Sequence, residues 1–171
     1  MIREIVVYPD KRLKLVSKEI KEFDEKLHTL LDDMYETMIA KNGIGLAAIQ
    51  IGIDLQALII NLVREDEEKQ FKEDLIEVIN PKILEMDGET TYQEGCLSVP
   101  EYYDDVKRAE HIKVSFFDRE GNEHIKEYNG LMAIAFQHEM DHLNGHLFIE
   151  KLSFLKRKKF EKEWKKKLKK K

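Results

Sequence analysis

The sequence contains little cysteine and no long apolar run. Its 171 residues include a single cysteine, Cys96, which excludes an internal disulfide and leaves a free thiol that is either buried or functional. No segment approaches the roughly 18 apolar residues of a membrane span, and the N-terminus has no apolar run long enough for a signal peptide. We therefore expect a protein of the cytoplasm.

Linkers and internal repeats are also lacking. The chain has three prolines, no Pro/Ser-rich stretch and a length close to that of one domain. Hydrophobic residues make up 42% and charged residues 37%, a composition far from that of disordered chains. These features predict one globular domain over residues 1–171.

Positive charge is concentrated at the C-terminus. Residues 156–171 contain eleven lysines or arginines and two glutamates, a net charge of +9, although the whole chain carries −5. Such a basic tail favours a polyanionic partner, but a terminal lysine-rich helix can equally serve to keep a protein soluble. Charge alone leaves both interpretations open.

Apolar residues recur at helical spacings in three segments, which predicts three helices. The first covers residues 23–41 and begins near Asp24, the second covers residues 131–143, and the third runs from about residue 153 to the C-terminus. The second is apolar around much of its circumference, so we expect it at the buried centre. The third carries one apolar stripe among its lysines, formed by Phe160, Trp164 and Leu168.

Strand patterns fill the region between the helices. A short apolar run over residues 55–62 is typical of a buried strand, and a charged loop is expected over residues 64–73. Two extended segments follow, which Pro81 and Pro100 are expected to interrupt or end. Alternation in residues 111–129 predicts a β-hairpin. Together these elements predict an α+β fold, with antiparallel or mixed strands packed around the central helix and a further helix at the C-terminus.

The central helix carries the pattern His-Glu-x-x-His, from His138 to His142. Residues at i and i+4 lie one turn apart on one face, so both imidazoles can bind one metal ion. Glu139 then lies beside the open coordination position, where it can accept a proton from water and later deliver it to a leaving nitrogen. The alternative is a pair of surface histidines bound to neighbouring acids. The apolar helix around them disfavours it, because buried histidines need partners.

Cys96 is the best candidate for a third metal ligand, because a catalytic site uses three protein ligands and one open position. A lone cysteine is more often a small buried apolar residue. Here, however, it lies in the segment EGCLS, where the glycine permits close backbone approach and the next amide is free to point into a site. A thiolate with two imidazoles suits zinc or ferrous iron.

A stretch of glycines and small residues, GIGLAAIQ, occupies residues 43–50. It lacks the lysine of a phosphate-binding loop and the three glycines of a dinucleotide fingerprint, so it is not a nucleotide loop. By itself it predicts no more than a tight turn.

Taken together, GIGLAAIQ, EGCLS and QHEMDHLNG, in this order and at these separations, resemble the three signature motifs of bacterial peptide deformylase. The similarity covers most of the chain, from VVYPDKRL near the N-terminus through INP at residues 79–81 to GHLFIEKLS after the histidines. It implies a metal-dependent amidohydrolase that removes the N-formyl group from the N-terminal formylmethionine of nascent polypeptides and releases formate.

The resemblance implies a metal site and its acid/base. The ligands fall on Cys96, His138 and His142, and the general acid/base falls on Glu139. The active metal of the family is usually ferrous iron, Fe(II), although Zn(II) and Ni(II) occupy the same ligands. The ligand set suits several divalent ions and does not choose among them.

The resemblance also implies how the substrate is bound. The side chain of Gln50 and the backbone N–H of Leu97 would donate hydrogen bonds to the oxyanion, a form of preorganised electrostatic stabilisation. The backbone of Gly45 would hold the substrate chain in an extended pose. The methionine side chain would enter an apolar pocket, expected by position to involve Ile44, Leu131 and Ile134.

Three further features follow from the resemblance. Glu94 and Arg108 match an acid and a basic residue of the family, which predicts an ion pair behind the cysteine-bearing strand. Tyr103 departs from the family pattern, because many relatives carry arginine near the mouth of the site. The basic helix of residues 153–171 is similar to the family's ribosome-docking extension, which implies ribosomal RNA as the polyanionic partner.

Two other functions compete with this reading. The first is a His-Glu-x-x-His peptidase that cuts internal bonds, which assays of formylated, acetylated and unblocked peptides would separate from a deformylase. The second is a non-enzymatic module with a structural metal and a nucleic-acid-binding tail. Closed structural sites use four protein ligands, so Asp141 or His146 would have to supply the fourth.

Overall fold

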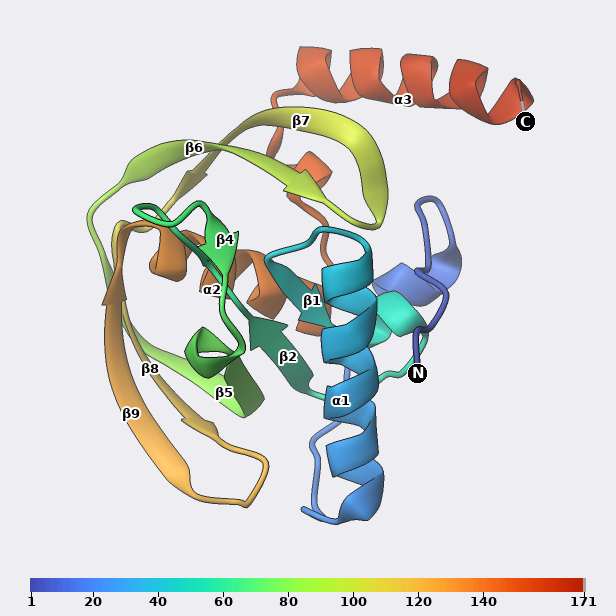
Figure 1. Cartoon of the computed structure of the whole chain (residues 1–171). Helices are drawn as coiled ribbons and strands as arrows, with labels where there is room; N and C mark the ends of the chain where they lie inside the picture. The colour runs from blue at the N-terminus through green and yellow to red at the C-terminus, as the bar shows by residue number, and fades with distance from the viewer. Residues whose placement is uncertain (171) are drawn as a thin grey trace.

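The computed structural model describes residues 1–170; only Lys171, the last residue of the predicted C-terminal helix, lies outside them. The described residues form three helices and nine strands, joined by short 3₁₀ turns, and Figure 1 shows how these elements are arranged. In chain order the elements are η1 (Lys11–Lys14), α1 (Glu25–Ala40), β1 (Gly45–Ala47), η2 (Ala48–Ile51), β2 (Ala57–Ile60), β3 (Val63–Arg64), β4 (Lys69–Gln70), η3 (Lys72–Asp74), β5 (Ile76–Asp87), β6 (Thr90–Cys96), β7 (Val99–Arg108), β8 (His111–Phe117), β9 (Glu123–Asn129), α2 (Gly130–Leu143), η4 (Phe148–Lys151) and α3 (Phe154–Lys169).

All strands pair antiparallel. The main sheet has the order β1-β2-β5-β8-β9, and two smaller sheets pair β3 with β4 and β6 with β7. Strands therefore combine with separate helices rather than alternating with them, and the predicted α+β class is confirmed. No helix among residues 1–170 has the length and apolar character needed to cross a membrane.

Helix α1 begins where its sequence predicts. The side chain of Asp24 accepts a hydrogen bond from the Leu27 N–H at 3.1 Å and so caps the first turn. The apolar face of α1 packs on β1 and β2, where Leu31 and Met38 share a buried cluster with Ile59. Burial of this face, more than local propensity, stabilises the helix.

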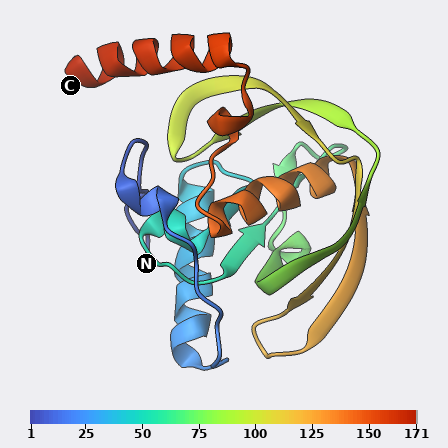
Figure 2. The same ribbon diagram turned by 180° about the vertical axis from the view of Figure 1, so that it is seen from behind.

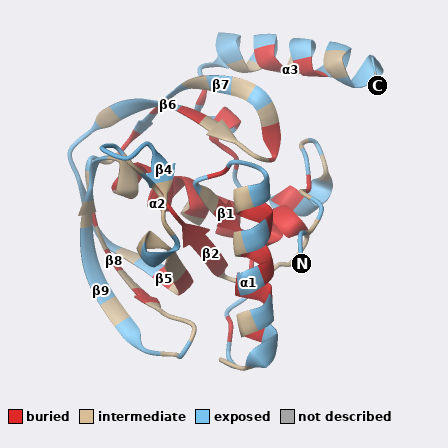
Figure 3. Cartoon of the chain, viewed as in Figure 1, coloured by how far each residue is buried: buried red, intermediate tan, exposed pale blue. Residues whose placement is uncertain are grey.

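Helix α2 lies at the buried centre of the fold, as the apolar residues around much of its circumference predict. Figure 2 shows it lying against the main sheet, and Phe136 belongs to a buried cluster that includes Leu58 and Val114. Figure 3 shows α2 and β2 mostly buried, in contrast to the mostly exposed outer strand β9. The rigid surroundings of α2 hold its polar side chains in fixed positions.

Both prolines expected to interrupt strands lie inside them. Strand β5 continues through Pro81 to Asp87, so the prediction that the strand is interrupted or ends there is wrong, although its register with β8 shifts between Ile79 and Lys82. Pro100 does not stop the chain's extended conformation, because β7 starts at Val99 and continues to Arg108. The prediction that Pro100 ends the extended segment is wrong. Pro100 lies at a register shift of the β6–β7 pair, so the absence of an N–H at this position breaks no hydrogen bond between the two strands.

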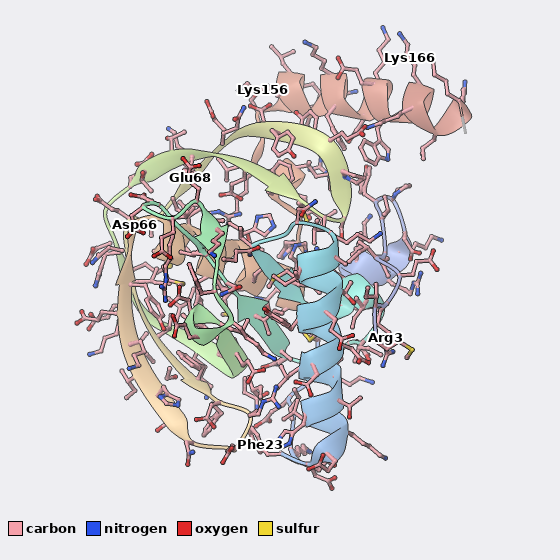
Figure 4. The ribbon with its side chains drawn as sticks, viewed as in Figure 1. Arg3, Phe23, Asp66, Glu68, Lys156 and Lys166 are labelled. Carbon is pink, nitrogen blue, oxygen red and sulfur yellow. The ribbon has the colours of Figure 1, made fainter. Side chains whose placement is uncertain are left out.

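The charged segment predicted as a loop contains short elements instead. Residues 63–70 form the β3–β4 hairpin, and Figure 4 labels Asp66 and Glu68 at its tip. Gln70 Nε2 donates a hydrogen bond to Gly43 O at 2.9 Å, which holds the hairpin to the segment that joins α1 and β1. Such non-local hydrogen bonds leave no periodic signal in a highly charged sequence.

Helix α3 lies along the outer side of the β6–β7 hairpin, as both views show (Figures 1 and 2). Phe160 packs on Tyr102 at a ring distance of 4.6 Å, and Trp164 Nε1 donates to Tyr8 O at 3.1 Å. The predicted apolar stripe is only partly buried, because Leu168 is 44% exposed. Two aromatic side chains therefore anchor a helix whose other side faces solvent.

Candidate metal centre and active site

Cys96, His138 and His142 converge at one point. The histidines lie one turn apart on α2 and the cysteine at the end of β6, and their ligand atoms all lie within 4.8 Å of one another. Cys96 Sγ is 3.4 Å from His142 Nε2. Among residues 1–170 no other histidines, cysteines or acids form such a group. A thiolate and two imidazoles at this spacing fit a divalent ion such as zinc or iron.

A buried carboxylate holds His138 in place. Glu94 Oε1 lies 2.8 Å from His138 Nδ1, which leaves Nε2 as the nitrogen available to a metal. Arg108 donates to both oxygens of Glu94 at 2.8 Å, so the predicted ion pair is confirmed. Burial acts to raise the pKa of Glu94, but the hydrogen bonds from Arg108 and His138 lower it below its ordinary value. The carboxylate is therefore charged when it orients the imidazole.

Arg108 also reaches α2. Its Nη1 atom donates to Asp141 Oδ2 at 2.6 Å, so one guanidinium connects β7, β6 and α2. Sequence reasoning considered Asp141 only as a possible ligand and missed this role. The feature of the sequence that could have indicated this role is the position of Asp141 three residues after His138, about one turn along the same helix.

His142 is suited to metal binding by its surroundings. Its side chain is buried, and burial together with the charges of His138 and Arg108 lowers its pKa well below the usual value. The neutral imidazole is the form that binds a metal ion.

Glu139 lies beside the ligands without a fixed partner. Its side chain is buried, its Oε1 atom has no hydrogen-bond partner among residues 1–170, and this atom is 4.0 Å from His142 Nε2. Burial raises the pKa of Glu139 to about 7. A side chain at Gly45 would place its Cβ 2.5 Å from Glu139 Oε2, so only glycine allows β1 to approach the carboxyl this closely.

Gln50 points its amide nitrogen at the cysteine. The Ala47 N–H donates to Gln50 Oε1 at 2.9 Å, which fixes the orientation of the amide. Nε2 then donates to Ser98 Oγ at 3.1 Å and to Cys96 Sγ at 3.4 Å. Ser98, which the motif analysis passed over, therefore helps to hold this donor in the site.

A pocket of about 530 Å³ opens over these groups. Cys96, His138 and Glu139 lie on its wall, whereas His142 is fully buried beneath them. Every residue predicted to bind the substrate or the oxyanion lines the same pocket: Ile44, Gly45, Gln50, Leu97, Leu131 and Ile134. Elements that are distant in sequence, namely β1, η2, β6 and α2, thus contribute to one concave site.

Neither candidate for a fourth protein ligand joins the group. Asp141 is bound to Arg108 and lies 3.8 Å from Lys151 Nζ. His146 is paired with Glu150 at 3.2 Å, and its side chain is 59% exposed. Among the described residues the ligand group therefore has three members, one fewer than a closed structural site uses, and a pocket lies beside it.

Known proteins share both the sequence and the fold. The family model for polypeptide deformylase matches residues 2–158. The chain is 58% identical to a peptide deformylase of Nautilia profundicola, over 98% of this chain and 96% of that protein, and 56% identical to one of Campylobacter jejuni, over 99% and 97%. A crystal structure of a peptide deformylase from Legionella pneumophila superposes with a TM-score of 0.88 at 42% identity, covering 99% of this chain and 98% of that one. The chain therefore belongs to the polypeptide deformylase family.

Proposed function

We propose that the pocket above Cys96, His138 and His142 is where this peptide deformylase removes the N-formyl group from the formylmethionine of nascent polypeptides. The observation that carries the proposal is the convergence of three metal ligands with the buried carboxyl of Glu139 and the amide of Gln50 on one pocket. A divalent ion bound by these ligands supplies Lewis acidity, which polarises the formyl carbonyl and lowers the pKa of water. The remaining steps belong to the protein's own side chains.

Glu139 moves the proton. It accepts a proton from the attacking water and delivers it to the amine nitrogen as the formyl C–N bond breaks, so that formate and a free amino terminus are released. A pKa of about 7, caused by burial, suits both halves of this transfer near neutral pH. The unpartnered Oε1 atom can approach the water without first breaking a hydrogen bond among the residues described.

Gln50 and Leu97 stabilise the negative charge that develops on the formyl oxygen. The Gln50 amide is held by Ala47 and Ser98, so it needs little reorganisation during the reaction. The backbone N–H of Leu97 follows Cys96 directly, at the wall of the pocket. Loss of one such donor typically lowers the rate by about 10²–10³-fold.

The methionine side chain binds among apolar residues at one side of the pocket. Ile134 lies one helical turn before His138 on α2, and Ile44 and Leu131 line the same space. The backbone of Gly45 pairs with the extended substrate chain, as an added strand would. These contacts place the formyl group over the ligands.

Ferrous iron is the metal we propose for the cell, with Zn(II) or Ni(II) able to replace it in the purified protein. The thiolate and two imidazoles support this range, because the set is intermediate between soft and hard ligands. Metal analysis of protein purified without oxygen, with activity measured after chelation and after return of each ion, tests the assignment.

The lysine-rich α3 is proposed to bind ribosomal RNA, which would place the enzyme beside emerging chains in the cytoplasm. Most of its lysines are exposed, and its apolar side is already covered by Tyr8 and Tyr102. Co-sedimentation with ribosomes should weaken steeply with added salt and in a variant with Lys158, Lys162 and Lys166 changed to glutamine. Binding that is independent of salt would contradict this partner.

The reaction itself is tested with matched peptides. Anaerobically prepared protein should release formate from formyl-Met-Ala-Ser, leave acetyl-Met-Ala-Ser intact and cut no internal bond. Activity should disappear with a chelator and return with Fe(II). Cleavage of internal bonds, or release of formate by metal-free protein, would count against the proposed site.

A further inference from the structure

Strand β7 lies beside helix α3 (Figure 1), and its residues 100–104 include both pocket-lining residues and residues that contact α3. Pro100, Glu101 and Tyr103 line the pocket. Tyr102 turns the other way and packs on Phe160 of α3. Any contact that fixes this segment against α3 therefore also fixes part of the pocket wall.

Two lysines of α3 bind the segment at its two ends. Lys156 Nζ donates to Asp104 Oδ1 at 3.1 Å. Lys167 Nζ lies 2.8 Å from Glu101 Oε2 and donates to Pro100 O at 3.4 Å. The two lysines are eleven residues, about three helical turns, apart, so α3 spans the segment like a brace.

The segment has a conformation that needs such contacts. Glu101 has φ of +64°, in the left-handed region, which is strained for a residue with a side chain. The β6–β7 ladder shifts register here: Cys96 pairs with Val99 and Gly95 with Tyr103. Residues 100–102 therefore lie within this register shift. Conformations of this kind persist where neighbouring groups hold them.

The other lysines of α3 differ from these two. Lys166 is exposed, and Figure 4 shows its side chain pointing away from the body of the protein. Lys159 is also exposed. Lys156 and Lys167 therefore differ from Lys159 and Lys166 in the contacts they make with β7 and not simply in exposure, because the Lys156 side chain is itself 54% exposed.

We propose that Lys156 and Lys167 are positioning residues of the deformylase reaction, which hold the Pro100–Asp104 segment so that the pocket binds peptide residues following the formylmethionine. The inference rests on the proposed function of the pocket. Glu101 and Tyr103 are exposed side chains at its mouth, whereas the ligands and the proposed methionine-binding residues come from other elements. Loosening the segment therefore weakens binding of longer peptides and leaves the chemistry at the formyl group unchanged.

The test compares two double variants with the same loss of charge. Lys156→Met with Lys167→Met should raise KM for formyl-Met-Ala-Ser about three- to tenfold, from the loss of two partly exposed ion pairs. The kcat of this variant on formyl-Met-Ala-Ser should stay within about twofold of the wild-type value, and so should its KM for formyl-methionine amide. The control, Lys159→Met with Lys166→Met, should behave as wild type on both substrates. Metal content and Trp164 fluorescence establish that the metal centre and the docked helix are intact.

Each other outcome has a defined meaning. The proposal would be overturned if KM for formyl-Met-Ala-Ser rose equally in the two double variants, or if it stayed unchanged in Lys156→Met with Lys167→Met. It would also be overturned if that variant raised KM equally for formyl-Met-Ala-Ser and formyl-methionine amide. Restoration of KM by exchanging charges, with Lys156→Glu and Asp104→Lys combined, would support a direct contact. If the wild type released no formate from either substrate, the proposed function and not the brace would have failed.

Discussion

Helix α2 buries nine of its fourteen residues, whereas α3 buries only Phe160 and Trp164 of its sixteen. Both helices are rich in polar side chains, but these side chains meet different surroundings. In α2, Gln137 donates to Ala109 O at 2.8 Å and His138 is held by Glu94, so polar groups are matched by specific partners. In α3, most lysines are solvated.

The difference between the two helices predicts where a substitution changes activity or stability most. A buried polar group that loses its partner retains its full desolvation penalty, whereas a solvated charge exchanges one partner for water. Matched substitutions in the two helices should therefore have unequal effects.

Glu139→Gln in α2 should lower the rate of formate release by about 10²–10⁴-fold, because the amide cannot carry the proton. Metal content and melting temperature should stay close to those of the wild type, since the side chain keeps its shape. The control is Glu163→Gln on the exposed side of α3, which should retain full activity. Full activity in Glu139→Gln would remove its proposed role.

Arg108→Met should lower the free energy of unfolding by about 3–5 kcal/mol, because it removes the guanidinium that pairs with both oxygens of the buried Glu94 carboxylate. Chemical denaturation of the metal-free protein measures this without interference from ligand binding. Arg157→Met is the matched change in α3, where the arginine is 43% exposed and pairs with Glu161, and it should change stability by less than about 0.5 kcal/mol. Equal losses in the two variants would contradict the contrast.

Trp164→Ala should destabilise the docking of α3 by about 3 kcal/mol, since it removes a buried aromatic group and the hydrogen bond to Tyr8. Hydrogen exchange should show loss of amide protection in α3 while α2 stays protected. Leu168→Ala, at the exposed end of the same stripe, should leave both helices protected. Simultaneous loss of protection in α2 and α3 would mean that the two helices unfold as one unit.

Asp104→Asn should have the smallest effect, about 1 kcal/mol at pH 7, and this effect should depend on pH. Partial burial acts to raise the pKa of Asp104, but hydrogen bonds from the Asp105 N–H, Lys156 and the Tyr102 hydroxyl lower it overall. Because the folded-state pKa lies below the unfolded value near 3.9, the ionised carboxylate stabilises the fold above pH 4. That contribution is lost as the pH falls through the folded-state pKa.

Unfolding of Asp104→Asn and wild type should therefore differ more at pH 7 than at pH 3. Asp105→Asn, an exposed neighbour, provides the control for the loss of one charge. A difference that stays constant between the two pH values would show that the carboxylate charge is not responsible.

Local patterns in the sequence were sufficient for much of the fold. The spacing of Leu31, Met34 and Met38 predicted α1, and the capping role of Asp24 followed from its side chain. The sequence predicts a loop for residues 64–73, where short strands and a 3₁₀ turn lie, and it does not show that Leu168 is the exposed member of the α3 stripe, because periodicity does not report which surface a segment meets.

The sequence by itself determined that His138 and His142 share one helix face, with Glu139 next to the first of them, because the i, i+4 relation is a local property of helical geometry. It also indicated Cys96 and Gln50 through motifs whose order and separation match a family. Only the tertiary structure decided that Asp141 completes the Arg108 network and that α3 braces the mouth of the pocket. Those contacts join residues 33 to 67 positions apart, so they depend on how the strands and helices pack and not on any local pattern.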